Sequence, residues 1–375
     1  MHLLALVVAT VGIWTTPAEL EQRPTSGPAW ENVLAYASQP APSPNLADPT
    51  DGTNVYVLAK ALVYARTGQE SYRDEVIAAI AAIQETENLG RTLALGRKLG
   101  AYVVAADLVG LPPAEDEAFR GWLAGVRHEV LDGDTLISTH ERRPNNWGTH
   151  AGFSRMAADL YLGDAEDFAR AAAVFHGWLG SHLAYSGFEF GERDWQADPL
   201  SPIGIDPAGT LVQGHNLDGA IPDDLRRSGP FAWPPPCENY VWTALQGALA
   251  QALVLDRQGL PAFDWQDSAL RRALIWQYDQ ARCAASGDDQ WLSAIAAWAY
   301  PKAFKAIDGA RPGKNMGFTD WTLLAGDPAP ACPADYDDDG FVGLLDFFAM
   351  ARGFGSRFGI EDFLEFGRHS WGACP

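Results

Sequence analysis

LAKALVYARTG, residues 58–68, places apolar side chains at Leu58, Ala61, Leu62 and Ala65. This i, i+3, i+4, i+7 spacing forms one face of an α-helix, and Thr67-Gly68 is a typical helix stop. The pattern recurs along the chain, whereas strand-like alternation of β-branched residues is scarce. Further helices are therefore expected at residues 72–83, 92–108, 114–130, 149–162, 166–179, 240–257 and 267–284.

Successive helices separated by short Gly or Asp turns predict an all-α protein, an incomplete (α/α) toroid. The stretch from Tyr185 to Pro236 breaks this rhythm and is rich in Gly, Pro, Asp and Trp. A loop region of this length inside a compact domain is usually functional, so we expect it to border a site. The predicted organisation is a signal peptide (1–18), a toroid domain (19–325), a linker (326–331) and a small C-terminal module (332–375).

The chain of 375 residues carries 48 acidic and 27 basic residues, a net charge of −21. Such a balance argues against a nucleic-acid partner. It also repels an anionic polymer at long range, so an enzyme acting on one must collect positive charge locally.

The apolar run from Leu3 to Ile13 is too short to span a bilayer and is typical of a signal peptide, with cleavage after Ala18. A buried N-terminal helix is the alternative. No later segment reaches membrane-spanning length, so we expect a secreted protein, extracellular or periplasmic.

Four cysteines fit an exported protein and allow three disulfide pairings. The local pairing, Cys237 with Cys283 and Cys332 with Cys374, is favoured. The chain has no C-x-x-C, which argues against a zinc site or a redox pair.

The segment DYDDDGFVGLLD, residues 335–346, has the spacing of an EF-hand loop. Carboxylates at loop positions 1, 3, 5 and 12 and a carbonyl at position 7 suit calcium, and Gly340 permits the sharp turn. The predicted ligands of a structural Ca²⁺ are Asp335, Asp337, Asp339, Phe341 and Asp346. The segment resembles one dockerin repeat, which implies a cohesin-like or cell-surface partner.

Two polar clusters are candidates for chemistry. The first runs from His140 to His150 and contains Arg143, Asn145, Asn146 and Trp147. Pro144 and the paired Asn mark a loop before a helix, and Asn146 and His150 share a face if the helix starts early. The alternative is that the Asn pair caps a helix while the arginines are solvated.

The second cluster begins at His215 and includes Asp218-Gly219, the Arg226-Arg227 pair, Trp233 and Tyr240. An ordinary loop with salt-bridged arginines is the alternative reading of this cluster.

Together the clusters resemble the alginate-lyase superfamily of α/α-toroid polysaccharide lyases, family 38 more closely than family 5. Asn145-Asn146 resembles that superfamily's Asn-Asn-His motif, and Asp218 to Arg227 resembles its Asp-Gly-x-x-Pro-x-Glu-x-x-Arg stretch, with Asp224 as the acidic residue. Arg66-Thr67-Gly68 with Tyr72, and Arg97 with Tyr102, fit its early helices. Two departures stand out: Trp147 occupies the place of the motif histidine, and Pro234 that of the catalytic tyrosine.

The resemblance implies cleavage of a polyuronate, alginate or glucuronan, by β-elimination without a catalytic cofactor. Such a site must neutralise the C6 carboxylate, remove the C5 proton and protonate the leaving O4. A tyrosine, whose pKa is ordinarily about 10, needs positive charge nearby for this work, which Arg226, Arg227 and His215 can provide. The expected catalytic residues are Asn146, His150, His215, Arg227 and Tyr240. The expected substrate-binding residues are Arg143, Asn145, Trp147, Trp195, Arg226 and Trp233.

Two rival functions stay open. An α/α-toroid glycoside hydrolase needs two carboxylates in its cleft. The acids of the long segment offer them: Glu189, Glu192, Asp194, Asp206, Asp218 and Asp224. A non-catalytic carbohydrate-binding protein is the other rival.

Overall fold

The computed structural model describes residues 12–41, 43–237 and 239–323, and in the C-terminal region residues 341–342, 350–358, 360 and 372–373. Within these residues the regular secondary structure is almost entirely helical. The principal helices are α2 (Pro28–Ala37), α3 (Thr53–Thr67), α4 (Glu70–Ala82), α5 (Thr92–Val109), α6 (Pro113–Val126), α7 (Leu136–Arg142), α8 (Asn146–Leu162), α9 (Ala165–Trp178), α11 (Asn239–Arg257), α12 (Trp265–Asp279) and α13 (Leu292–Ala299).

Short elements complete the fold. Helical turns lie at α1 (Pro17–Leu20), α10 (Pro222–Leu225), η1 (Arg226–Ser228), η2 (Gly287–Asp289) and α14 (Thr319–Thr322). Strands β1 (Leu211–Val212) and β2 (His215–Asn216) pair antiparallel, as do β3 (Phe341–Val342) and β4 (Gly372–Ala373).

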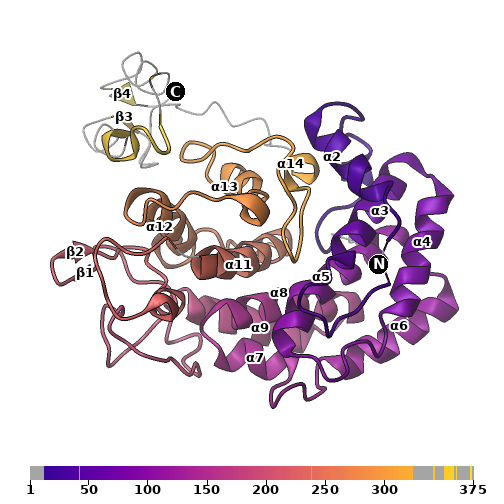
Figure 1. Cartoon of the computed structure of the whole chain (residues 1–375), viewed down its shortest axis with the longest axis horizontal. Helices are drawn as coiled ribbons and strands as arrows, with labels where there is room; N and C mark the ends of the chain where they lie inside the picture. Colours follow the sequence, from indigo (N-terminus) through magenta and orange to yellow (C-terminus); the bar gives the residue numbers. More distant parts are fainter. Residues whose placement is uncertain are drawn as a thin grey trace, which may run out of the picture.

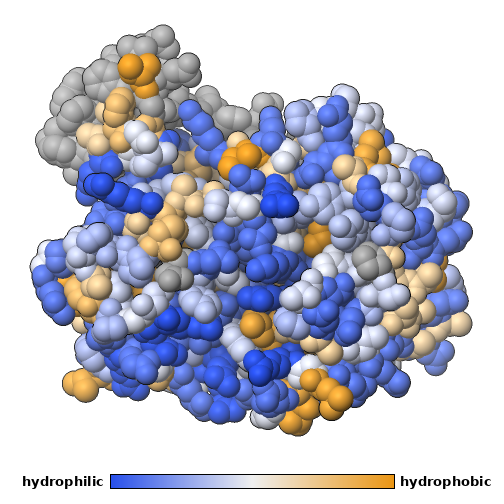
Figure 2. Space-filling model, in the orientation of Figure 1, coloured by the Kyte–Doolittle hydropathy of each residue, from blue (hydrophilic) through white to orange (hydrophobic). Residues whose placement is uncertain are grey.

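The helices curve around a centre formed by α5, α8 and α11, with α4 and α6 at one side and α12 and α13 at the other (Figure 1). Helix α8 packs against α5, α7, α9 and α11. The predicted all-α toroid class is confirmed. The face shown in Figure 2 is largely hydrophilic, with apolar residues in small scattered groups.

Two glycines allow α8 to lie close to both of its central neighbours. A Cβ at Gly96 on α5 would come 2.9 Å from the Ala151 nitrogen, and one at Gly247 on α11 would come 2.4 Å from the Thr149 carbonyl carbon. A Cβ atom this close to another heavy atom would overlap with it, and the closely packed interior leaves no room for the helices to move apart. The first turns of α8 are therefore held between two backbones, and His150 is fixed at the centre of the fold.

Helix α7 was not among the predicted helices. The sequence suggested a loop marked by Pro144 and the Asn pair before a helix at residues 149–162, but His140 lies in α7, which begins with a capping box between Thr135 and Ser138. The loop is only Arg143 to Asn145, because Asn145 caps α8 through its side chain and the helix starts at Asn146.

The N-terminal residues 12–20 contribute to the core. Trp14 is 1% exposed and packs against Phe153 and Trp291. The cleavage position predicted after Ala18 falls inside α1, so cleavage there would remove Trp14 from the packed interior. Residues 1–11 of the predicted signal lie outside the described residues.

The predicted disulfide between Cys237 and Cys283 is present, with the two Cα atoms 5.1 Å apart. It links the approach to α11 with the chain after α12. Cys332, Cys374 and the predicted linker lie outside the described residues, as do four of the calcium ligands, Asp335, Asp337, Asp339 and Asp346. Of Phe341, the remaining predicted ligand, only the backbone in β3 is described.

Part of the C-terminal region contacts the toroid. Met350 and Phe358 are buried, and Arg357 forms a buried ion pair of 3.0 Å with Asp279 on α12. Among the described helices, none combines the length and apolar character needed to cross a bilayer. The described residues also contain no group of three or more His, Cys, Asp or Glu placed to hold a metal ion.

Candidate active site

Three of the expected catalytic residues meet, each from a different segment of the chain. Asn146 opens α8, Arg227 lies in η1 and Tyr240 is the second residue of α11. Arg227 Nη1 donates a hydrogen bond of 2.8 Å to Asn146 Oδ1. Its guanidinium carbon lies 3.9 Å from the centre of the Tyr240 ring.

The contact with Arg227 fixes which way the Asn146 amide points. A guanidinium has only donors, so it must meet the amide oxygen and not the nitrogen. The Nδ2 group of Asn146 therefore faces away from Arg227 as a donor. A carboxylate, which accepts hydrogen bonds, is the complementary ligand for this donor and for the guanidinium beside it.

A pair of aspartates holds the Asn pair from behind. Asn145 Nδ2 donates to Asp223 Oδ2 at 3.0 Å, and the Asn146 backbone N–H donates to Asp224 Oδ1 at 3.2 Å. Asp223 also forms an ion pair of 2.7 Å with Arg226. Asn145 and Arg226, which we expected to bind substrate, are both engaged with Asp223 at the start of α8.

Asp224 is fully buried, and its Oδ2 atom has no hydrogen-bond partner among the described residues. Burial raises the pKa of Asp224 well above its usual value, and the neighbouring Asp223 carboxylate adds to this effect. Asp224 is therefore favoured as a neutral group that anchors the helix.

His150 lies one turn after Asn146 and is completely buried. Neither ring nitrogen has a hydrogen-bond partner among the described residues. Burial lowers the pKa of His150 well below its usual value, and the nearby Arg97 and Lys314 lower it further. The ring is therefore neutral near pH 7. Because His150 has no exposed surface, it cannot touch a substrate in this conformation, and any role it has in the site is through the residues packed around it.

Positive charge gathers around His150. Burial lowers the pKa of Arg97; the Asp288 carboxylate opposes this effect, and Arg227 adds to it. Lys314 forms an ion pair of 3.4 Å with Asp288. Arg97, Arg227 and Lys314 thus form a local cationic centre. Because the chain as a whole is acidic, an enzyme of this composition that acts on an anionic polymer needs such a local concentration of positive charge.

The second histidine, His215, belongs to an aromatic group in the long segment. Its ring stacks on Trp233 with the ring centres 4.4 Å apart, and both residues are half-buried. Trp195 packs against Phe231 and donates from Nε1 to the Gly229 carbonyl. Because Trp195 is only 1% exposed, its ring supports the segment and offers no face to a sugar.

Arg143 and Trp147 form a pair on the outer side of the loop. The Arg143 guanidinium lies 5.7 Å from the Trp147 ring centre and forms an ion pair of 3.1 Å with Asp134. Asp134 also binds Arg142 at 2.7 Å. The basic run before α8 is therefore largely neutralised by carboxylates, unlike Arg227.

Sequence reasoning did not assign Arg97 and Lys314 to the site. Arg97 did carry a signal, because it belongs to an early-helix motif of the resemblance described above. Lys314 carried none: it follows the last long helix, in a Gly-rich turn without a recognisable motif.

A sequence model of the alginate lyase family matches residues 50–192. Among solved structures, an alginate lyase from Bacteroides ovatus aligns with a TM-score of 0.53 over 84% of this chain and 99% of its own. The chain is similar to alginate lyases. The two sequences are 13% identical, so this structural likeness concerns the fold. A comparison with curated proteins gives no match.

The family match to alginate lyases includes Arg97, Asn146 and His150 but ends before Arg227 and Tyr240. The family match supports a polysaccharide lyase, as the sequence resemblance implied, and the structural likeness supports the predicted fold.

Proposed function

We propose that the chain cleaves a uronate polymer by β-elimination and leaves a 4,5-unsaturated uronic acid at the new non-reducing end. The meeting of Asn146, Arg227 and Tyr240 is the observation that carries this proposal. Alginate is the first substrate to test, because the matched family and the structural neighbour both carry its name. Glucuronan, which has the same carboxylate chemistry, is the second.

The first requirement of the reaction is to neutralise the C6 carboxylate. Arg227 holds the Asn146 amide by its oxygen, so that Nδ2 and the remaining guanidinium N–H groups are donors for this carboxylate, and Arg97 adds a nearby positive charge. As the C5 proton leaves, negative charge grows on the carboxylate oxygens. Fixed donors stabilise this enolate-like state more strongly than the ground state, which lowers the barrier.

Tyr240 is the proton-transfer group of this proposal. Its side chain is partly open to solvent, with 36% of the residue exposed, and the Arg227 guanidinium lies over its ring. The phenolate oxygen takes the C5 proton, the C5–H electron pair forms the C4=C5 double bond, and the C4–O4 bond breaks. The same phenol then returns the proton to O4, so the enzyme finishes unchanged.

The neutral His150, one turn after Asn146, lies close enough to Arg97 and Lys314 to feel both charges and adds no further cation. His215 remains the alternative histidine, and a sugar can approach it only beside Trp233, which covers one face of its ring. Replacing each histidine by Gln separates the two roles.

The rival glycoside hydrolase gains no support from the six candidate carboxylates. Glu189, Glu192 and Asp218 are ion-paired, Asp194 accepts a backbone hydrogen bond, and Asp206 and Asp224 are buried. None of the six is both accessible and unengaged, as a general acid facing a water-activating base would require.

The test is a panel of polymannuronate, polyguluronate, glucuronan and a neutral glucan, assayed for ultraviolet-absorbing product and for new reducing ends. Both signals from one polyuronate support the lyase. New reducing ends without absorbing product would identify a hydrolase, and binding with neither signal would identify a non-catalytic carbohydrate-binding protein.

The calcium loop, the partner and secretion are further parts of this proposal. The EF-hand spacing of residues 335–346 supports one structural Ca²⁺ that takes no part in the chemistry. Chelation should therefore leave elimination intact in a chain ending near Asp327. A cohesin-like or cell-surface partner of the C-terminal module is tested by pull-down with and without calcium, and export by the N-terminal sequence of the secreted product.

A further inference from the structure

Lys314 lies at the edge of the cationic centre, apart from the three residues that the proposed reaction uses. Half of its side chain is exposed, 49%, so a polymer can reach it. Its partner Asp288 is 32% exposed, and the 3.4 Å between the charged atoms is long for a charge-assisted hydrogen bond. Ion pairs of this kind contribute little to stability and exchange partners at low cost.

The backbone around Lys314 is nevertheless fixed. Asn54, which is fully buried, donates from Nδ2 to the carbonyls of Lys314 and Asn315 at 3.0 and 3.1 Å. Asn315 Nδ2 in turn donates to the Gln246 carbonyl at 3.2 Å. The position of Lys314 thus depends on buried amide contacts with α3 and α11, and not on its ion pair.

The same Gln246 places the counterion. Its Nε2 group donates to the Asp288 carbonyl at 3.2 Å and to Asp289 Oδ1 at 2.7 Å. Gln246 on α11 therefore positions both ends of the ion pair: Asp288 through its own side chain, and Lys314 through the neighbouring Asn315. Gln246 lies six positions after Tyr240, about 9 Å further along the helix axis.

Lys314 also acts on the charges of the site. It lowers the pKa of the buried His150, and Asp288 interacts with Arg97, which interacts with Arg227. The positive groups thus form a series from Arg227 through Arg97 to Lys314. Asp288 is the one carboxylate among the described residues that is ion-paired with any member of the series.

We propose that Lys314 binds the carboxylate of the uronate unit next to the one that is cleaved, and that Asp288 is the internal counterion which the substrate displaces. This inference rests on the proposed function, because it places a second anionic sugar beside the reacting one. A polymer with a carboxylate on every unit fits such a series of cations, whereas a polymer charged at isolated units does not.

The test compares Lys314→Met, which keeps the apolar stem, with Lys314→Arg and the wild type on a series of oligouronates of increasing length. For oligomers long enough to reach Lys314, the Met variant should raise KM about tenfold, the loss of one modest charge contact. Its kcat should stay unchanged, and the shortest cleaved oligomer should show no change at all. Lys314→Arg should restore KM, and Asp288→Asn should lower it.

Arg91→Ala is the matched control, since it removes an exposed cation from a surface pair with Asp132. Equal KM values for Lys314→Met and wild type at every length would overturn the proposal. So would a loss of kcat on the shortest oligomer, which would place Lys314 in the reaction centre. Circular dichroism of each variant separates misfolding from lost binding.

Failure of the proposed function looks different. In that case the wild type makes no unsaturated product from any polyuronate, and calorimetric titration of the wild type and the Met variant with alginate replaces the kinetics. Equal affinities in that titration would also reject the Lys314 subsite.

Discussion

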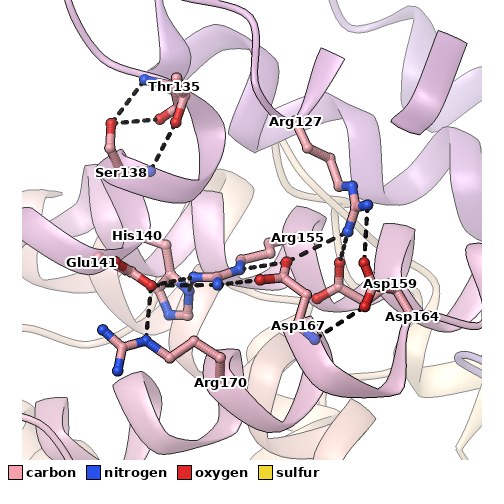
Figure 3. Close-up of polar contacts among 10 residues, drawn as sticks. All are labelled: Arg127, Thr135, Ser138, His140, Glu141, Arg155, Asp159, Asp164, Asp167 and Arg170. Atoms are coloured by element: carbon pink, nitrogen blue, oxygen red, sulfur yellow. Dashed lines mark hydrogen bonds and ion pairs between the residues drawn. The ribbon is translucent and has the colours of Figure 1, made fainter. Parts of the chain in front are cut away.

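Helix α8 carries two charged regions that differ in one respect, the ratio of carboxylates to cations. On its outer side, Arg155 pairs with Asp167 at 2.5 Å and Glu141 at 3.4 Å, while Arg127 pairs with Asp159, Asp164 and Asp167 (Figure 3). On its inner side, Arg97 and Lys314 act on His150 and Arg227 acts on Arg97, with Asp288 as the paired carboxylate.

Both regions combine basic residues with a buried histidine, so the presence of arginines alone does not reveal their roles. In the outer network Arg127 and Arg155 are neutralised and nearly inaccessible, and their ion pairs join α7, α8 and α9 into one unit. In the inner region the cations exceed their partners among the described residues and are partly exposed. Buried balanced charges serve structure, whereas an excess of one sign in an accessible place attracts a ligand of the other sign.

The largest expected effect tests the chemistry of the inner region. Tyr240→Phe keeps the ring under Arg227 and deletes only the hydroxyl group. Turnover should fall by about 10²–10⁴, the usual contribution of a general acid–base group, while the melting temperature stays within error. Rates of ultraviolet-absorbing product formation measure this. Near-normal elimination by Tyr240→Phe would remove Tyr240 from the mechanism and make His215 the leading base.

The next effect separates the two regions directly. Arg155→Ala removes the buried arginine that joins Asp167 to Glu141 and leaves them, among the described residues, only Arg127 at 3.4 Å for Asp167 and Arg170 at 3.0 Å for Glu141. The change should cost up to about 3–5 kcal/mol of unfolding free energy. The folded fraction should retain most of its turnover. Arg227→Ala should do the opposite: it should lose about 10²–10³ in turnover, as when one transition-state donor is removed, with little change in stability.

Urea unfolding and steady-state kinetics on both variants complete this test. Arg155→Lys is the control for charge, since it keeps the cation but lacks the planar fork that reaches two carboxylates. If both variants lost stability and turnover in the same proportion, the distinction between a structural and a ligand-binding region would fail.

The Asn pair gives a smaller, local version of the comparison. Asn145→Ala removes the N-cap of α8 and its bond to Asp223, which should cost about 0.5–2 kcal/mol of stability. Asn146→Ala should leave stability nearly intact and lower kcat more than it raises KM, because its contact strengthens as the carboxylate gains charge. Equal effects of the two changes on kcat would argue against a special role for Asn146.

Much of this arrangement was predictable from the sequence. Helical periodicity identified α3 to α6, α8, α9, α11 and α12. Motif resemblance named Asn146 and Arg227, whereas motif spacing put Pro234 at the place of the tyrosine and Tyr240 was only the nearest candidate. Helix α7 was missed because it is short and mostly polar, so no apolar periodicity marks it, and only the capping box at Thr135 and Ser138 indicates its start. Trp195 was misjudged because burial depends on which rings pack against it. Lys314 was not predictable, since its place depends on Asn54, 260 residues earlier in the chain.

The smallest expected effect is a pH dependence of the outer network. Burial, followed by the neighbouring Asp167 carboxylate, raises the pKa of Asp159 to about 8. The folded state therefore binds this proton more tightly than the unfolded chain, in which the pKa of an aspartate is about 4. The resulting stability is fully present below pH 4 and is lost as the pH rises through 8.

Over the range from pH 7 to 9, the wild type should accordingly lose stability that an Asp159→Asn variant, which has no proton to release, does not lose. A difference of about 1 kcal/mol would shift the melting temperature by roughly 2–4 °C in a chain of this size. Melting curves of both proteins across this range measure it, with Asp116→Asn as a control at an exposed ion pair on α6. Parallel curves for wild type and Asp159→Asn would mean that Arg127 keeps Asp159 ionised throughout. The outer network would then be a fully charged assembly and the contrast with the neutral His150 on the inner side would be sharper still.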